Sequence, residues 1–168
     1  MIVCTQLDPS NKKQHRTFLK LMHAYIRELE RHRQKKTSKR VLKKWTKSVI
    51  ETGCTSGRHL CLVHYNRKPV GFFYGKVDRE GDRGEIRPGW GYVMEFFVKK
   101  RYRRQGIGTE MNDILEALLR QDGAEHFYLT ADPITGNPFW IAQGYTPTGV
   151  MSRENKQEIF EKIWASIL

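Results

Sequence analysis

The segment at residues 98–109 is the clearest candidate for a chemical function. Two glycines one residue apart, Gly106 and Gly108, stand where an apolar stretch gives way to a helical pattern. Glycine has no Cβ, so a ligand can approach the backbone closely, and the free amides and dipole of a helix N-terminus favour an anion. Further positive charge comes from Arg101, Arg103 and Arg104. The segment therefore predicts an anion site, in particular one for a diphosphate.

Three other interpretations of this segment are weaker. A dinucleotide-binding fingerprint needs a third glycine where Met111 stands, and a P-loop needs Gly-Lys-Ser/Thr at its end. The third interpretation is an ordinary helix N-terminus with basic neighbours. The expected order of strand, loop and helix favours the anion site over it.

One acidic residue interrupts the apolar run that precedes this segment. Glu95 lies within Val93–Val98, where a carboxylate is costly unless it is hydrogen-bonded or functional. We therefore take Glu95 as the best candidate for a general base. The alternative is that its side of the strand faces solvent or an arginine. Glu85, in the preceding loop, is a second candidate base.

Hydrophobic periodicity predicts the elements that would position these residues. Strands are expected at 2–7, 60–65, 70–77, 92–98, 126–131 and 144–150. Helices are expected at 11–33, 38–53 and 106–122, within 132–143, and at 153–166. This order predicts an α/β fold in a single domain over residues 1–168. Its mixed, mostly antiparallel sheet would have about six strands, with helices on both faces.

Composition limits the class of protein and its partners. The chain has 30 basic and 18 acidic residues, a net charge of +12, and enough apolar residues for a core. Three cysteines without metal-ligand spacing argue against a disulfide scaffold or a metal site. Without a signal-like start or an apolar run of about 20 residues, we expect a soluble cytoplasmic protein that does not use a membrane.

The positive charge is concentrated at Arg31–Lys44, which holds eight Lys or Arg residues and no acid. A polyanion such as nucleic acid is one interpretation. A solvated helix surface is the other, and we favour it because no nucleic-acid-reading motif accompanies the run. A nucleic-acid partner is therefore possible but not favoured.

Two motifs together resemble the GNAT superfamily of acyl-CoA-dependent N-acetyltransferases. The first is Arg103-x-x-Gly106-x-Gly108, preceded by Phe96-Phe97-Val98. The second is Phe139-Trp140-Ile141-Ala142-Gln143-Gly144-Tyr145, about 40 residues later, in the expected elements. With the strand order, the resemblance covers roughly residues 60–150.

The resemblance implies acetyl-CoA as co-substrate and a sheet splayed between 92–98 and 126–131. Backbone near Phe96 and Val98 would pair with the pantetheine amides, and the amides of 103–109 would hold the pyrophosphate. The coenzyme-binding residues implied are Phe96, Phe97, Val98, Arg103, Arg104, Gln105, Gly106, Ile107, Gly108, Thr109, Asn137 and Trp140. The acetyl group would pass directly to an amine, so Cys61 is not needed as a nucleophile and is expected in the core.

Two positions depart from the family pattern. Trp140 stands where the family often has a tyrosine general acid, so a proton for the coenzyme sulfur must come from water, Tyr145, Tyr128 or elsewhere. Pro133 stands where an asparagine is usual. The hydrogen bond to the coenzyme would then come from Asp132, Thr135 or Asn137.

The leading hypothesis is an acetyl-CoA-dependent N-acetyltransferase whose acceptor is a primary amine of a small molecule or a protein. An RNA- or ribosome-associated protein, a tRNA- or protein-modifying acetyltransferase and a non-catalytic acyl-CoA-binding domain are the alternatives. The oligomeric expectation is a monomer or a homodimer.

Overall fold

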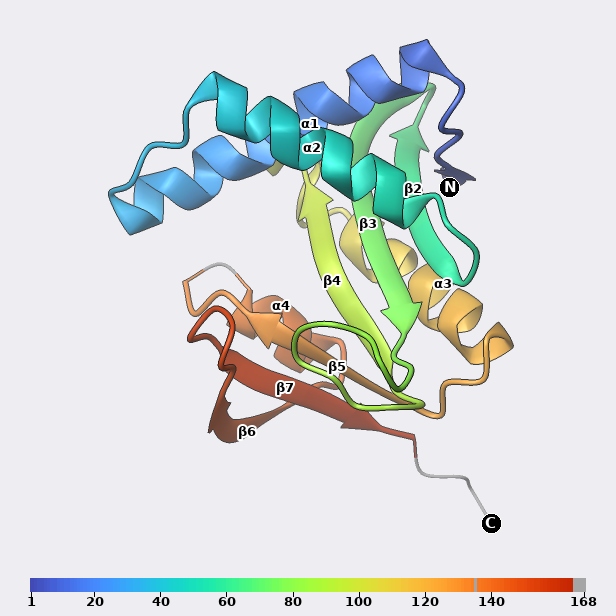
Figure 1. The fold of residues 1–168 in the computed structure, drawn as a ribbon, viewed down its shortest axis with the longest axis vertical. Helices are drawn as coiled ribbons and strands as arrows, with labels where there is room; N and C mark the ends of the chain where they lie inside the picture. The colour runs from blue at the N-terminus through green and yellow to red at the C-terminus, as the bar shows by residue number, and fades with distance from the viewer. Residues whose placement is uncertain (135, 165–168) are drawn as a thin grey trace. The chain divides into compact units, whose positions relative to one another are not determined.

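The computed structural model describes residues 1–134 and 136–164 and has a mixed α/β fold (Figure 1). The strands are β1 (Ile2–Gln6), β2 (Arg58–Tyr65), β3 (Lys68–Val77), β4 (Gly91–Val98), β5 (His126–Ala131), β6 (Thr146–Met151) and β7 (Glu158–Ile163). The helices are α1 (Lys12–Arg33), α2 (Lys39–Gly53), α3 (Ile107–Gln121) and α4 (Asn137–Ala142), with a 3-10 turn, η1 (Lys100–Tyr102).

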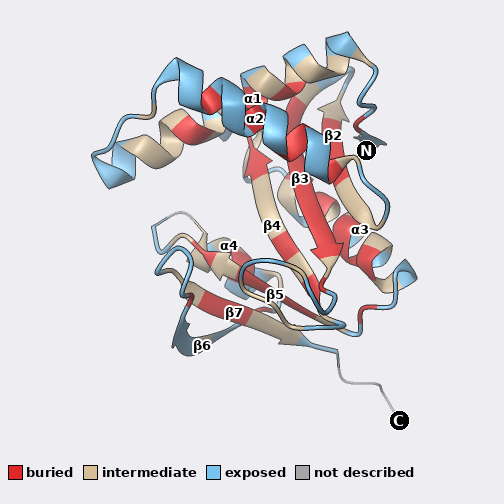
Figure 2. Ribbon diagram, viewed as in Figure 1, coloured by how far each residue is buried: buried red, intermediate tan, exposed pale blue. Residues whose placement is uncertain are grey.

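The strands form one open, mostly antiparallel sheet in the order β1-β2-β3-β4-β5-β7-β6. β4 pairs in parallel with β5 at Gly91–Val93, as expected for two strands joined by the crossover helix α3. Figure 2 shows β3 buried over most of its length. The expected fold class is confirmed.

The chain divides into two compact units. The first comprises Met1–Tyr74 and Glu95–Met111. The second comprises Gly75–Met94 and the described residues from Asn112 onward. Within the described residues, no helix is both long and apolar enough to cross a membrane.

In the first unit, α1 and α2 begin where polar side chains cap them. The Asn11 side chain accepts hydrogen bonds from the amides of Lys13 and Gln14, both at 3.1 Å. The Ser38 hydroxyl accepts one from the Val41 amide at 3.2 Å. Such caps satisfy amides that have no partner within the helix. Both helices therefore start as their sequences predict.

Aromatic rings join α1 to β3 and β4. Phe18 meets Phe72 edge to face at 5.0 Å between ring centroids, and Tyr25 lies 5.5 Å from Phe97. At Gly71, β3 approaches β4 so closely that a Cβ would lie 2.1 Å from the Phe97 carbonyl oxygen. This packing fixes Tyr25 against β4, and Glu95 lies in the same strand.

In the second unit, a buried acid holds the loop between β3 and β4. Asp78 is 1% exposed and pairs with Lys76 at 2.9 Å. It also accepts hydrogen bonds from the Tyr128 hydroxyl and from the Arg87 amide, the latter at 2.9 Å. The loop is thereby tied to β5.

A second buried acid, Glu116 on α3, gathers several donors. Its carboxylate is 3% exposed and accepts a hydrogen bond from Lys162 at 2.9 Å and one from Tyr145 at 3.1 Å. Asn112 and Arg120 donate to it at 2.8 and 3.1 Å. These bonds tie α3 to β7 and to the segment after α4.

Replacing Glu116 with glutamine should destabilise the fold. The change leaves the Lys162 and Arg120 charges without their counter-charge, which costs about 3 kcal/mol in the free energy of unfolding at a buried pair. Urea unfolding measures it, with the exposed Glu125→Gln as the matched control. Equal unfolding midpoints for the two variants would contradict this role.

The expected closing helix at 153–166 is wrong. Residues Glu158–Ile163 form β7, which pairs antiparallel with β5. His126 lies opposite Ile163 at one end of the pairing, and Ala131 lies opposite Glu158 at the other. The chain therefore has a seventh strand where the sequence predicted about six. Ile159 and Phe160 are both buried in it, so burial does not alternate as it does in a strand with one solvated face. The end of the predicted helix, residues 165–166, lies outside the described residues.

Candidate functional site

The candidate base Glu95 is half-buried on β4 and is hydrogen-bonded to α1. The Tyr25 hydroxyl of α1 donates a hydrogen bond to its Oε2 at 2.7 Å. Burial raises the pKa of Glu95 to about 7, while the Tyr25 hydrogen bond and the charge of Arg33 oppose the rise. A carboxylate with this pKa can take a proton near neutral pH and hold it.

Arg103 fixes the end of β4 against α1. Its Nε donates to the Val98 carbonyl at 2.8 Å, and its guanidinium makes a two-pronged ion pair with Glu28 at 2.7 and 2.8 Å. The guanidinium also lies over the Phe97 ring at 5.8 Å. The Arg103 side chain is therefore engaged within the protein, and its backbone amide donates to the Lys100 carbonyl at 3.2 Å, so the amides for the predicted anion must come from later in the loop.

The loop from Arg103 to Thr109 contains the predicted anion site, and two of its residues have left-handed backbone. Arg104 and Gly106 have φ values of 58° and 80°, in the left-handed region. The Glu110 amide donates to the Gly106 carbonyl at 3.0 Å and opens the ladder of α3. The amides of Ile107 and Gly108 precede that ladder, where a helix directs its positive end outward.

The other side chains of this loop differ in exposure. Arg104 and Gln105 are exposed, and the Gln105 amide group donates to the Arg101 carbonyl at 3.0 Å. Arg101 lies over the Tyr102 ring at 4.8 Å. Arg104 is therefore the arginine of the motif best placed to meet an anion. The first unit brings this loop together with Glu95, Phe96, Phe97 and Val98.

The predicted coenzyme residues Asn137 and Trp140 lie in the second unit, on α4. The Oδ1 atom of Asn137 is buried and has no hydrogen-bond donor among the described residues. A buried acceptor without a donor is costly, so this atom fits a ligand that donates to it. Trp140 is 7% exposed and meets Tyr145 edge to face at 5.3 Å. Thr135 lies outside the described residues.

Neither tyrosine considered as an acid is free to supply a proton. The Tyr128 hydroxyl donates to Asp78 and the Tyr145 hydroxyl to Glu116. Burial and the adjacent carboxylates raise the pKa of both phenols above the ordinary value. Trp140 offers no acidic proton either. Water is therefore the better proton source for a thiolate.

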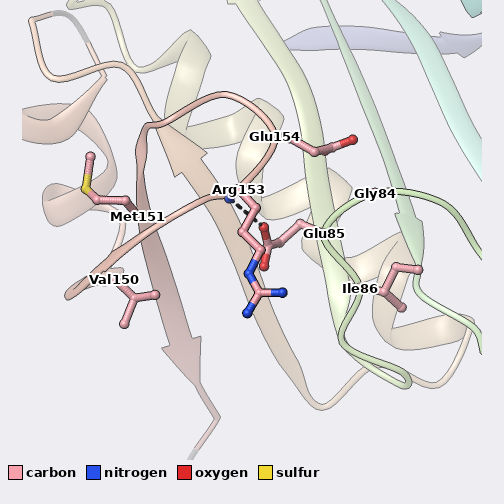
Figure 3. Close-up of a pocket in the computed structure, with 7 residues that line it drawn as sticks. All are labelled: Gly84, Glu85, Ile86, Val150, Met151, Arg153 and Glu154. Atoms are coloured by element: carbon pink, nitrogen blue, oxygen red, sulfur yellow. Dashed lines mark hydrogen bonds between the residues drawn. The ribbon is translucent and has the colours of Figure 1, made fainter.

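The second candidate base, Glu85, lines a cavity of about 510 Å³ with Ile86, Met151 and Arg153 (Figure 3). Its Oε2 accepts hydrogen bonds from the Ser152 hydroxyl and the Arg153 amide, both at 3.2 Å. These bonds attach the carboxylate to the segment after β6. We therefore assign Glu85 a structural part in the second unit.

Cys61 lies in the core, as the sequence predicted. It is 4% exposed, and burial raises the pKa of its thiol to about 12. The thiolate is the nucleophilic form of cysteine, so this side chain is inert near neutral pH.

The comparisons with known proteins agree with this architecture. A family model described as "Acetyltransferase (GNAT) family" matches residues 18–137. The chain therefore belongs to the GNAT acetyltransferase family. No curated protein sequence matches it.

Solved structures share the fold at low sequence identity. The PaiA N-acetyltransferase from Thermoplasma acidophilum, in complex with coenzyme A, is 12% identical with a TM-score of 0.70, covering 98% of this chain and 99% of that one. A GNAT-family acetyltransferase from Staphylococcus aureus Mu50 is 13% identical with a TM-score of 0.72, covering 98% and 100%. An aminoglycoside 6'-N-acetyltransferase complexed with coenzyme A is 14% identical with a TM-score of 0.71, covering 98% of both chains.

Proposed function

We propose that this acetyltransferase moves an acetyl group directly from acetyl-CoA to a primary amine, with Glu95 as the general base. The observation that carries the proposal is the half-buried Glu95 carboxylate, whose pKa of about 7 suits proton transfer at neutral pH. The anion-binding loop belongs to the same unit and follows β4 closely in the chain.

The coenzyme supplies an activated thioester, and the protein binds and orients it. The amides of Ile107 and Gly108 and the positive end of α3 bind the diphosphate, with Arg104 adding charge. Arg103 holds the loop through Val98 and Glu28 and thereby keeps these amides in place. Two structures with the same fold carry coenzyme A, which supports this use of the fold.

Glu95 acts on the acceptor. An alkylammonium must lose a proton before its nitrogen can attack a carbonyl carbon, and Glu95 accepts that proton directly or through one water. The attack forms the N–C bond, the nitrogen gives up its second proton to water, and the C–S bond then breaks. A backbone amide near Phe96–Val98 stabilises the developing oxyanion, and water protonates the leaving thiolate.

Acceptor-dependent thiol release tests this function. The purified chain is mixed with acetyl-CoA and a panel of amines: amino acids, polyamines, aminoglycosides and peptides with free amino groups. We expect at least one amine to raise thiol release well above the hydrolysis rate, together with an acetylated product of the matching mass. Thiol release without acetylated amine would contradict the proposal.

Tyr25 tunes the base, so Tyr25→Phe should shift the pH dependence of the reaction. The Tyr25 hydrogen bond favours the ionised form of Glu95, so its loss raises the pKa of that carboxyl above about 7. The acidic limb of the kcat/KM profile should then move to higher pH, with the plateau at high pH retained. An unchanged limb would show that another group titrates there. Tyr102→Phe removes a tyrosine hydroxyl outside this contact and serves as the control variant.

A further inference from the structure

The solvent side of α2 carries a row of cations. Arg40, Lys43, Lys44 and Lys47 are exposed and follow one another at intervals that place them on one side of the helix. Figure 2 shows exposed residues along this helix and along the connection from α1. We call these four residues the basic row.

The basic row is unfavourable for the helix that bears it. Like charges three or four residues apart repel, and Lys39 and Arg40 add positive charge at the end where the helix dipole is already positive. Among the described residues, Lys47 alone in the row has an ion-pair partner, Glu51 at 3.7 Å. The helix would be more stable without this charge, so solvation is an incomplete explanation for it.

The neighbouring basic residues have ordinary explanations. Arg31 and Arg33 lie in the last turn of α1, where positive charge complements the negative end of the dipole. Glu30 pairs with Arg27 at 2.6 Å and also accepts a hydrogen bond from the Thr37 amide. The unexplained charge is therefore that of α2.

Apolar side chains border the basic row. Val41 is 56% exposed and Trp45 is 36% exposed, and they are four residues apart on the same helix. The opposite side of α2 is buried through Leu42, Val49 and Ile50, so the helix cannot insert an apolar face into a membrane. A ring beside cations instead suits a strand whose bases are unstacked.

We propose that this side of α2 binds single-stranded nucleic acid. The basic row neutralises phosphates, and Trp45 stacks on an unpaired base, which RNA loops present and duplex DNA does not. The proposal does not depend on acetyl transfer, because it uses none of the residues assigned to that site.

Salt-dependent binding of a labelled single-stranded RNA of about 20 nucleotides tests it. In one variant, all four residues of the basic row are replaced by glutamine. We expect its affinity for the RNA to fall at least tenfold. The slope of log affinity against log salt should become shallower by about 3, at roughly 0.7 for each phosphate contact. The thermal midpoint should stay level or rise, because repulsion within α2 is relieved.

The matched control removes four cations from the start of α1 as Lys12, Lys13, Arg16 and Lys20→Gln. It carries the same net charge as the first variant. An equal loss of affinity in the control would show that binding follows net charge alone and would overturn the proposal. Equal affinity for a DNA duplex or for anionic vesicles would overturn it as well.

Substitution of Trp45 provides a second, independent test of the proposal. Trp45→Ala should lower affinity about tenfold at an unchanged salt slope, because stacking involves no counterion release. Trp45→Phe should restore most of the affinity. An unchanged affinity in Trp45→Ala would remove the argument for unpaired bases and overturn the assignment to single strands.

Discussion

Replacing Glu95 with glutamine is expected to lower the rate of acetyl transfer by a factor of about 10²–10⁴ while leaving coenzyme binding intact. Glutamine has nearly the same shape and can still accept the Tyr25 hydrogen bond, but it cannot take a proton from an ammonium group. The measurement is kcat/KM for the best amine, with coenzyme affinity measured separately by calorimetry.

The matched control for this prediction is Glu85→Gln, which removes the second candidate base. Its hydrogen bonds to Ser152 and Arg153 give it a structural part, so we expect near-native kcat/KM. A large loss in Glu85→Gln with full activity in Glu95→Gln would reverse the assignment.

The Glu95→Gln variant should also be more stable than the native chain above pH 7. The pKa of Glu95 is about 7 in the folded protein against an ordinary 4.5, so the folded state holds the proton more tightly than the unfolded state. Native stability therefore falls as pH rises from about 4.5 to about 7, by at most roughly 3 kcal/mol, and the variant lacks this loss. Lost activity with gained stability separates a missing base from a misfolded protein.

The second large effect is expected at Gly106, where Gly106→Asp should abolish coenzyme binding. Gly106 directly precedes α3, the position at which an aspartate side chain accepts hydrogen bonds from the first helical amides. The new carboxylate would occupy the amides assigned to the diphosphate and repel its charge. We expect coenzyme affinity to fall by a factor of about 100 or more, measured by calorimetry.

Gly123→Asp is the matched control, because both glycines have positive φ and open space around the Cβ position. Both changes therefore add backbone strain of about 1–2 kcal/mol. Charge at Gly123 follows the negative end of α3 and should cost more stability than charge at Gly106. Native coenzyme affinity in Gly106→Asp would contradict the anion site. Equal losses in both variants would assign the effect to strain.

The sequence predicted the starts of the helices, because these depend on residues that are close together in the chain. The Asn11 and Ser38 caps mark the starts of α1 and α2 within one residue of the expected positions. Apolar spacing was not sufficient for burial on α2, because Val41 and Trp45 are exposed. β7 was missed for a physical reason. Ile159, Phe160, Ile163 and Trp164 recur at helical intervals, and only their pairing with β5 makes a strand of them.

The hydrogen-bonded residue pairs of the candidate site could not be predicted from neighbouring residues in the sequence. Tyr25 and Glu95 are 70 residues apart in the chain, and Glu28 and Arg103 are 75 apart. Glu95 could be found because an acid in an apolar strand is conspicuous. Its hydrogen bond, and the use of Arg103 to hold β4 and α1, depend on tertiary packing.

Thermal unfolding with increasing acetyl-CoA tests coenzyme binding, on which the proposed acetyl transfer depends. Over about 10 μM to 1 mM ligand, we expect a saturable rise of the unfolding midpoint, and a smaller rise with dephospho and desulfo analogues. A hundredfold excess over Kd adds about 2.7 kcal/mol, which corresponds to roughly 5–10 °C for a chain of this size. No rise at about 1 mM would contradict a coenzyme site in this chain and, with it, the proposed acetyl transfer.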